Sequence, residues 1–158
     1  MNPHIPRRQK IEYTLNESKE WNAYAPLHYA AMNGELASTK VLLKADDLDI
    51  NTVSNLRRTP LHLAAQKEHA DVLSELIEAG ANMNSLDHQK CTPLMLAAKY
   101  GSLKALEALL IRNAKYSLVD YRKWTALHYA SFYNQPKIVK KLVRWDFDRQ
   151  YLVKARNS

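Results

Sequence analysis

Histidine recurs at regular places in this chain, at residues His28, His62 and His128. Imidazole is a common zinc ligand, and a zinc site holds its ligand atoms about 2 Å from one ion. If each histidine occupies the same place in one of several stacked helical units, neighbouring histidines lie about 10 Å apart. They cannot then share an ion. The sequence therefore predicts no metal site and a structural role for all three side chains.

The single cysteine, Cys91, is the other residue with chemical potential. Its neighbour Lys90 would lower the pKa of the thiol somewhat, but we expect an ordinary exposed thiol at a loop tip. A catalytic site also needs a base and an orienting group in contact with the nucleophile. The polar residues of this chain instead recur at repeat positions or fall on exposed helix faces. We therefore predict a protein that is not an enzyme and binds no cofactor.

Each of the three histidines lies inside a copy of one short motif. The clearest copy, residues 59–65, reads Thr-Pro-Leu-His-Leu-Ala-Ala, and altered copies occupy residues 25–31, 92–98 and 125–131. The copies begin at intervals of 34, 33 and 33 residues. A fixed period of this length indicates supersecondary units that stack on one another.

The second unit shows how each repeat would build two helices. Thr59 is suited to cap a helix whose first residue is Pro60, where the missing N–H costs nothing. Paired aliphatic residues between Val72 and Ile77 give the stripe of a second helix. Gly80 suits the left-handed end of that helix, and a polar loop then leads to the next motif.

This pattern resembles the ankyrin repeat, in the motif at residues 59–65, the paired aliphatics of the second helix, Gly80-Ala81 and Asn84. The resemblance implies an all-α fold, a solenoid of stacked antiparallel helix pairs with β-hairpin finger loops. It covers residues 21–158, and residues 1–20 are expected to form a basic or capping segment before it. The repeats are expected at about residues 21–54, 55–87, 88–120 and 121–153, followed by a truncated or capping tail.

The resemblance also implies roles for single residues. In the family the motif histidine braces the hairpin loops by hydrogen bonds, and an asparagine, here Asn51 and Asn84, stabilises the hairpin. These two asparagines also resemble sites that an asparaginyl hydroxylase modifies, which is a secondary prediction. The family usually has glycine two residues before the motif threonine. Arg57, Lys90 and Lys123 stand there in this chain, which predicts basic fingertips.

Proteins of this family bind partners through the fingers and the exposed ends of the first helices, on the concave face. The resemblance therefore implies a scaffold for protein–protein interaction. Aromatic residues and arginine are enriched at such interfaces, and cations would steer an acidic partner. The pattern leaves open that Trp124 and Phe132 pack between repeats instead. The candidate partner-binding residues are Trp21, Tyr24, Arg58, Lys90, Lys99, Tyr100, Tyr121, Arg122, Lys123, Trp124, Phe132 and Tyr133.

Composition bears on the remaining interpretations. The net charge of +7 favours a partner with an acidic and apolar surface, and one cysteine suits a reducing compartment. No signal peptide or membrane-length apolar run is present. We expect a monomeric intracellular protein, cytoplasmic and/or nuclear, with no small-molecule substrate and no membrane insertion.

Two other functions stay open at this point. From Asn134 onward seven Lys and Arg residues stand against two Asp, which would suit nucleic acid or an acidic membrane surface. Stacked helix pairs are not a usual groove-reading module, however. The third interpretation is the regulatory segment of a larger signalling or channel protein.

Overall fold

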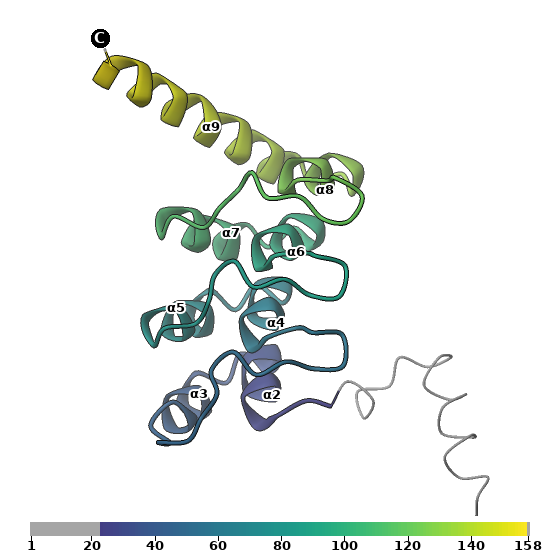
Figure 1. Cartoon of the computed structure of the whole chain (residues 1–158), viewed down its shortest axis with the longest axis vertical. Helices are drawn as coiled ribbons and strands as arrows, with labels where there is room; N and C mark the ends of the chain where they lie inside the picture. The colour runs from purple at the N-terminus through teal and green to yellow at the C-terminus, as the bar shows by residue number, and fades with distance from the viewer. Residues whose placement is uncertain (1–22, 158) are drawn as a thin grey trace, which may run out of the picture.

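The computed structural model describes residues 23–157, and in this range every regular element is an α-helix. The helices come in pairs joined by tight turns, and longer loops connect one pair to the next (Figure 1). This arrangement confirms the predicted all-α solenoid. In chain order the helices are α2 (Pro26–Asn33), α3 (Leu36–Leu42), α4 (Pro60–Gln66), α5 (Ala70–Glu78), α6 (Pro93–Tyr100), α7 (Leu103–Ile111), α8 (Ala126–Phe132) and α9 (Pro136–Asn157).

The first helix of each pair stacks on the first helix of the next pair. Helices α2, α4, α6 and α8 contact one another in that order and form one layer, and α3, α5, α7 and α9 form a second layer beside it (Figure 1). The loops that enter α4, α6 and α8 project past the first layer and lie one above another. We call the turns at the tips of these loops, residues 54–58, 87–91 and 120–124, the fingers.

The motif threonines start the first helices, as the sequence predicts. The side chains of Thr59, Thr92 and Thr125 each accept a hydrogen bond from the backbone N–H three residues on. Pro60 and Pro93 follow at the first helical position. Replacing such a cap by alanine costs about 1 kcal/mol of stability. Each threonine therefore stabilises the start of a first helix, directly after the finger that precedes it.

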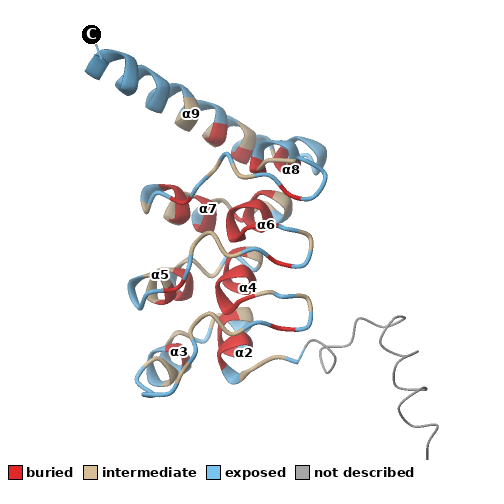
Figure 2. Ribbon diagram, in the orientation of Figure 1, coloured by how far each residue is buried: buried red, intermediate tan, exposed pale blue. Residues whose placement is uncertain are grey.

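The core lies between successive pairs and is continuous along the stack (Figure 2). Ala64 and Ala98 are fully buried in the first-helix layer, where their small side chains allow neighbouring helices to approach closely. Leu73 and Leu106 are fully buried on the second helices. Because each pair has apolar residues on both sides, the stack is the folding unit.

Helix α9 differs from the other second helices in its length. It has 22 residues, against nine for α7, and it runs through the repeat boundary expected at residue 153. Its outer half leaves the stack and is exposed (Figures 1 and 2). The Tyr116 hydroxyl donates to Asp146 at 2.8 Å, and Arg149 donates to Asn113 at 2.9 Å, so two contacts hold the helix against the preceding loop.

Candidate interaction surface

Each finger is closed by a tight turn. The backbone N–H of Ser54 donates to the carbonyl of Arg58 at 2.9 Å, and Asp87 does the same to Cys91 at 3.0 Å. The third finger repeats the bond between Asp120 and Trp124. Among the described residues no loop contains a β-strand. The fingers expected as β-hairpins are therefore hairpin turns without a ladder.

Buried aspartates hold two of the fingers from inside, and the sequence reasoning missed them. Oδ1 of Asp87 accepts backbone N–H bonds from Gln89 at 2.8 Å and Cys91 at 2.9 Å. Oδ1 of Asp120 accepts the equivalent pair, from Arg122 and Trp124. The sequence does contain a signal for this role, because an aspartate stands five residues before the motif threonine in both repeats.

Motif histidines brace two fingers, as the family resemblance implies. Nδ1 of His62 accepts from the backbone N–H of Thr59 at 3.1 Å, so its proton lies on Nε2, which donates to the Cys91 carbonyl at 2.9 Å. His28 makes the same contact with the Arg58 carbonyl. Burial lowers the pKa of His62 to about 4, so the ring is neutral at pH 7. His128 lies on the exposed side of α8, where it caps its own helix and stacks on Trp124 without bracing a finger.

The prediction of an exposed thiol at Cys91 is wrong. The residue is 1% exposed, because the finger turns back at Asp87 and directs this side chain into the stack. Burial raises the pKa of the thiol to about 11 and outweighs the hydrogen bond with Tyr129 and the charge of Arg58, which lower it. Its sulfur lies 3.1 Å from the Tyr129 hydroxyl. Cys91 therefore packs one repeat against the next and is not part of the exposed surface.

Asn51 and Asn84 bridge successive repeats. Oδ1 of Asn51 accepts from the backbone N–H of Asn82 at 2.9 Å, and Oδ1 of Asn84 accepts from Lys115 at 3.0 Å. The loops between pairs are thereby tied together at their bases. Hydroxylation of either asparagine stays a prediction.

The structure brings all five candidate aromatic residues of the last two repeats into one continuous row. Lys99 Nζ lies 5.3 Å from the ring centre of Tyr100 and 5.1 Å from that of Tyr133. The rings of Tyr133 and Phe132 meet edge to face at 5.1 Å, and Phe132 meets Trp124 at the same distance. We call these residues, with Arg122 and Tyr121 at the far end, the aromatic row.

A cation and an aspartate fix the far end of the aromatic row. The Arg122 guanidinium lies over the Trp124 ring at 4.0 Å and donates to the Tyr129 hydroxyl at 3.2 Å. That hydroxyl donates to Oδ2 of Asp120 at 2.6 Å. Burial opposes ionisation of Asp120, but hydrogen bonds from Tyr129 and the finger backbone, with the Arg122 charge, hold its pKa below the ordinary value. Tyr129 was not among the candidate residues.

The remaining candidates fall outside this row. Arg58 is engaged with the buried Asp87 at 3.5 Å and with Gln66 at 3.3 Å. Tyr24 stacks on His28 with ring centres 5.3 Å apart. Trp21 lies outside the described residues.

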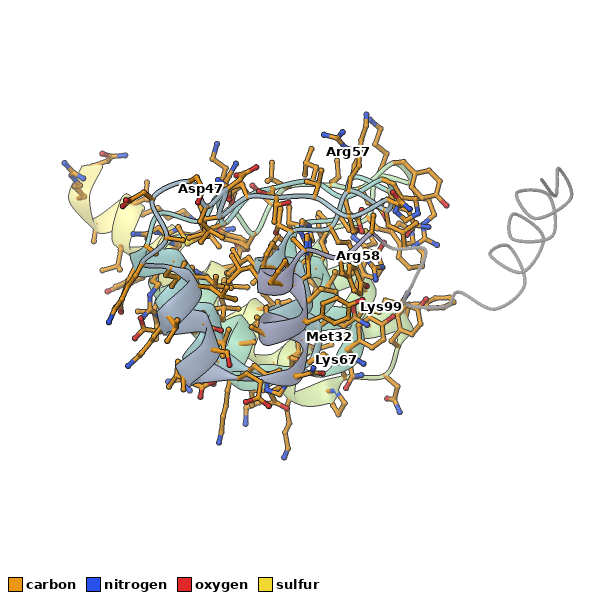
Figure 3. All side chains as sticks on the ribbon, turned by 90° about the horizontal axis from the view of Figure 1, so that it is seen from below. Met32, Asp47, Arg57, Arg58, Lys67 and Lys99 are labelled. Carbon is orange, nitrogen blue, oxygen red and sulfur yellow. The ribbon has the colours of Figure 1, made fainter. Side chains whose placement is uncertain are left out.

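The basic candidates occupy two levels of the surface. Lys90 and Lys123 stand at fingertips, as Arg57 does. In the view from below the stack, Arg58, Lys67 and Lys99 lie on one side of the first helices and Arg57 lies out on a finger (Figure 3). Cations thus occur both along the first helices and at the tips of the fingers.

Comparison with known proteins agrees with this architecture. A sequence model of ankyrin repeats (three copies) matches residues 7–87 and 71–151. The match covers most of the chain, and the chain belongs to the ankyrin-repeat family. Ankyrin repeats serve in general as protein-interaction modules, and the family is generally non-enzymatic.

Several curated proteins are similar over part of the chain. Alpha-latrocrustotoxin-Lt1a of Latrodectus tredecimguttatus is 36% identical over 74 residues, 47% of this chain and 5% of that protein. Ankyrin repeat domain-containing protein 53 of Macaca fascicularis is 30% identical over 83 residues, 47% of this chain and 17% of that protein. Ankyrin repeat domain-containing protein 7 of Homo sapiens is 44% identical over 52 residues, 33% of this chain and 20% of that protein. The chain thus spans at most a fifth of the length of these three relatives.

Two further findings concern other kinds of site. Within residues 23–157 no helix combines the length and apolar character needed to cross a bilayer. In the same part of the chain, no three His, Cys, Asp or Glu side chains are grouped so that they could hold a metal ion.

Proposed function

We propose that this chain is a non-enzymatic interaction module that binds a partner protein across its concave face. The aromatic row of the third and fourth repeats is the principal contact surface. The observation that carries the proposal is the position of Lys99, which lies against two exposed tyrosines, Tyr100 and Tyr133. The three side chains form an apolar surface with a cation at its centre.

The exposure of the row supports a role in binding. Interiors of protein interfaces are rich in aromatic side chains, which supply large contact area with few rotatable bonds. Four aromatic rings on one side of a small domain form a larger contiguous apolar surface than scattered single residues do. Their exposed fractions are 47% for Tyr100, 59% for Tyr121, 68% for Phe132 and 39% for Tyr133.

The charges around the row define the chemistry of the partner. Lys99 and Arg122 belong to the row, and Lys123 stands beside it on the finger. The two aspartates of this region, Asp87 and Asp120, are 3% and 2% exposed and face inward. A partner that combines apolar groups with carboxylates would therefore fit this surface and would be attracted at a distance.

Trp124 has a supporting role in this proposal. It packs against Tyr129 at 5.5 Å and is covered on one face by Arg122. Its substitution would disturb the fold of the last finger as well as the surface. Tests of binding should therefore alter the exposed tyrosines instead.

The proposal is tested by quantitative affinity capture from an extract of the cells that produce the protein. We expect the double substitution Tyr100→Ser and Tyr133→Ser to remove at least 90% of the proteins that the unaltered chain retains specifically. A matched control, Ile111→Ser with Tyr151→Ser, removes two exposed apolar side chains from α7 and α9 and should retain them. Equal capture by both folded variants would refute the assignment of the aromatic row.

A further inference from the structure

The three fingertips present one cation each, at a backbone conformation that suits glycine. Arg57, Lys90 and Lys123 have φ angles of 57°, 61° and 68°. This left-handed region strains residues that carry a Cβ atom. All three residues are exposed. A strained conformation kept with the same charge in three successive repeats is a reason to look for a function there.

The fingers hold these cations in a fixed register. The backbone N–H of His88 donates to the Leu56 carbonyl of the preceding finger at 2.9 Å. The equivalent bond runs from Tyr121 to the Gln89 carbonyl at 3.2 Å. Because both bonds join the same positions of successive fingers, the spacing of the tips follows the pitch of the stack. Neighbouring helices in such stacks lie about 10 Å apart.

The fingers carry no accessible opposite charge. Within residues 54–58, 87–91 and 120–124 the only acids are Asp87 and Asp120, and both are buried. Their carboxylates are engaged with finger backbone from inside. Arg57, Lys90 and Lys123 make no ion pair with any described residue. The row of tips is therefore a line of three cations open to a ligand.

We propose that this fingertip row binds an extended acidic segment of a partner protein, with a carboxylate at every third residue. A polyproline II helix has three residues per turn and rises about 3.1 Å per residue, so every third side chain lies on one face at intervals of about 9.3 Å. That interval matches the pitch of the stack. A β-strand matches it less well, because its side chains alternate between two faces.

The inference rests on the proposed function, since it describes the part of the partner that lies beyond the aromatic row. The two contacts are separable, however. The cations at the tips, Arg57, Lys90 and Lys123, are not among the residues of the aromatic row, so either set can be substituted without the other. Exposed ion pairs are weak and screened by salt, so binding by the tips alone should be modest and should fall as ionic strength rises.

The experiment compares two labelled peptides of the same composition and charge by fluorescence anisotropy at low salt. One is four repeats of Glu-Pro-Pro, with a carboxylate at every third residue. The other is two repeats of Glu-Glu-Pro-Pro-Pro-Pro, in which no two carboxylates are three residues apart. We expect the first peptide to bind the full chain at least about 5-fold more tightly.

Variants then locate the contact. The triple substitution Arg57→Gly, Lys90→Gly and Lys123→Gly removes the cations while giving the backbone the residue that its φ angles favour, so the chain should stay folded and lose the preference between the peptides. The triple substitution Lys44→Gln, Lys137→Gln and Lys140→Gln removes the same charge from exposed positions outside the fingers and should keep the preference. The Tyr100→Ser, Tyr133→Ser variant should also keep it.

Three results would overturn the inference. Equal affinity for the two peptides would show that only net charge matters. An unchanged preference in the fingertip variant would place the contact elsewhere. Tighter binding of a single-stranded oligonucleotide than of the in-register peptide would identify a nucleic acid as the ligand. None of these results affects capture through the aromatic row, so the proposed function is tested independently of this inference.

Discussion

The Tyr129 hydroxyl donates a 2.6 Å hydrogen bond to Oδ2 of Asp120, and this bond joins helix α8 to the finger that precedes it. Oδ1 of the same carboxylate holds the finger backbone. The Cys91 sulfur approaches the tyrosine oxygen from the finger before. The third and fourth repeats are thus connected through one buried polar cluster beneath the aromatic row.

Substituting Tyr129→Phe should destabilise the chain by about 1–3 kcal/mol, because a buried carboxylate loses a hydrogen bond from a neutral donor that nothing replaces. Equilibrium urea unfolding followed by circular dichroism measures the change. Tyr151→Phe on exposed α9 is the matched control and should change the free energy of unfolding by less than about 0.5 kcal/mol. Equal values for the two variants would show that the Asp120 bond does not stabilise the fold.

Cys91 should be nearly inert toward thiol reagents in the native protein. Burial raises the pKa of its thiol to about 11, and only the thiolate reacts. We expect the absorbance change with Ellman's reagent at pH 8 to be slower than in urea-unfolded protein by at least about 100-fold. With one cysteine in the chain, the signal has a single source. A native rate close to the unfolded rate would mean that the second finger, which carries Cys91, opens readily.

The stability of the chain should fall as the pH drops below 6.5. In the folded protein burial lowers the pKa of His62 from 6.5 to about 4. Below pH 6.5 the unfolded chain therefore takes up a proton that the folded chain refuses, and each pH unit costs up to roughly 1.4 kcal/mol. The pKa of His28 is lowered by burial as well, and it contributes in the same direction.

His62→Met isolates this effect, since methionine already occupies the equivalent buried place at Met95. The variant loses the brace to the Cys91 carbonyl and should be less stable at pH 7. Its free energy of unfolding should nevertheless depend less steeply on pH between 6.5 and 5 than that of the unaltered chain. Parallel pH profiles from urea titrations would contradict the buried neutral histidine.

The left-handed fingertips predict a gain in stability from glycine. Lys90 has a φ angle of 61°, a conformation that costs a residue with a Cβ atom about 1–2 kcal/mol. Glycine avoids this steric cost, but it loses more backbone entropy on folding, which costs about 0.5–1 kcal/mol. Lys90→Gly should therefore be more stable than Lys90→Ala by roughly 0.5–1 kcal/mol. Both variants lose the same charge, and thermal unfolding compares them. A less stable glycine variant would show that the turn is not strained.

The repeat architecture could be predicted from sequence because its signals are local. The interval between motifs, the threonine caps and the paired aliphatic residues of α5 each follow from the residues themselves. The length of α9 had a local signal too, since neither glycine nor proline follows Pro136.

The polar interior of the fingers could not be placed in the same way. Whether Cys91 points outward depends on the turn that Asp87 closes, and this is a matter of three-dimensional geometry. The contacts of Tyr129 with Asp120 and Cys91 span nine and 38 residues. The aromatic row was composed of predicted residues, but its continuity rests on the contact of Lys99 on α6 with the Tyr133 ring at the end of α8, which no spacing rule indicates.

Site-specific photo-crosslinking would show whether a partner binds across the concave face. A benzophenone amino acid replaces Tyr100 in the aromatic row or, in a second sample, Ile111, which is 68% exposed on α7 in the other layer. Both samples are irradiated in the cells that produce the protein, and crosslinked products are identified by mass spectrometry. Binding across the concave face predicts a discrete protein adduct from position 100 and none from position 111. The same adducts from both positions, or an adduct from position 111 alone, would contradict it.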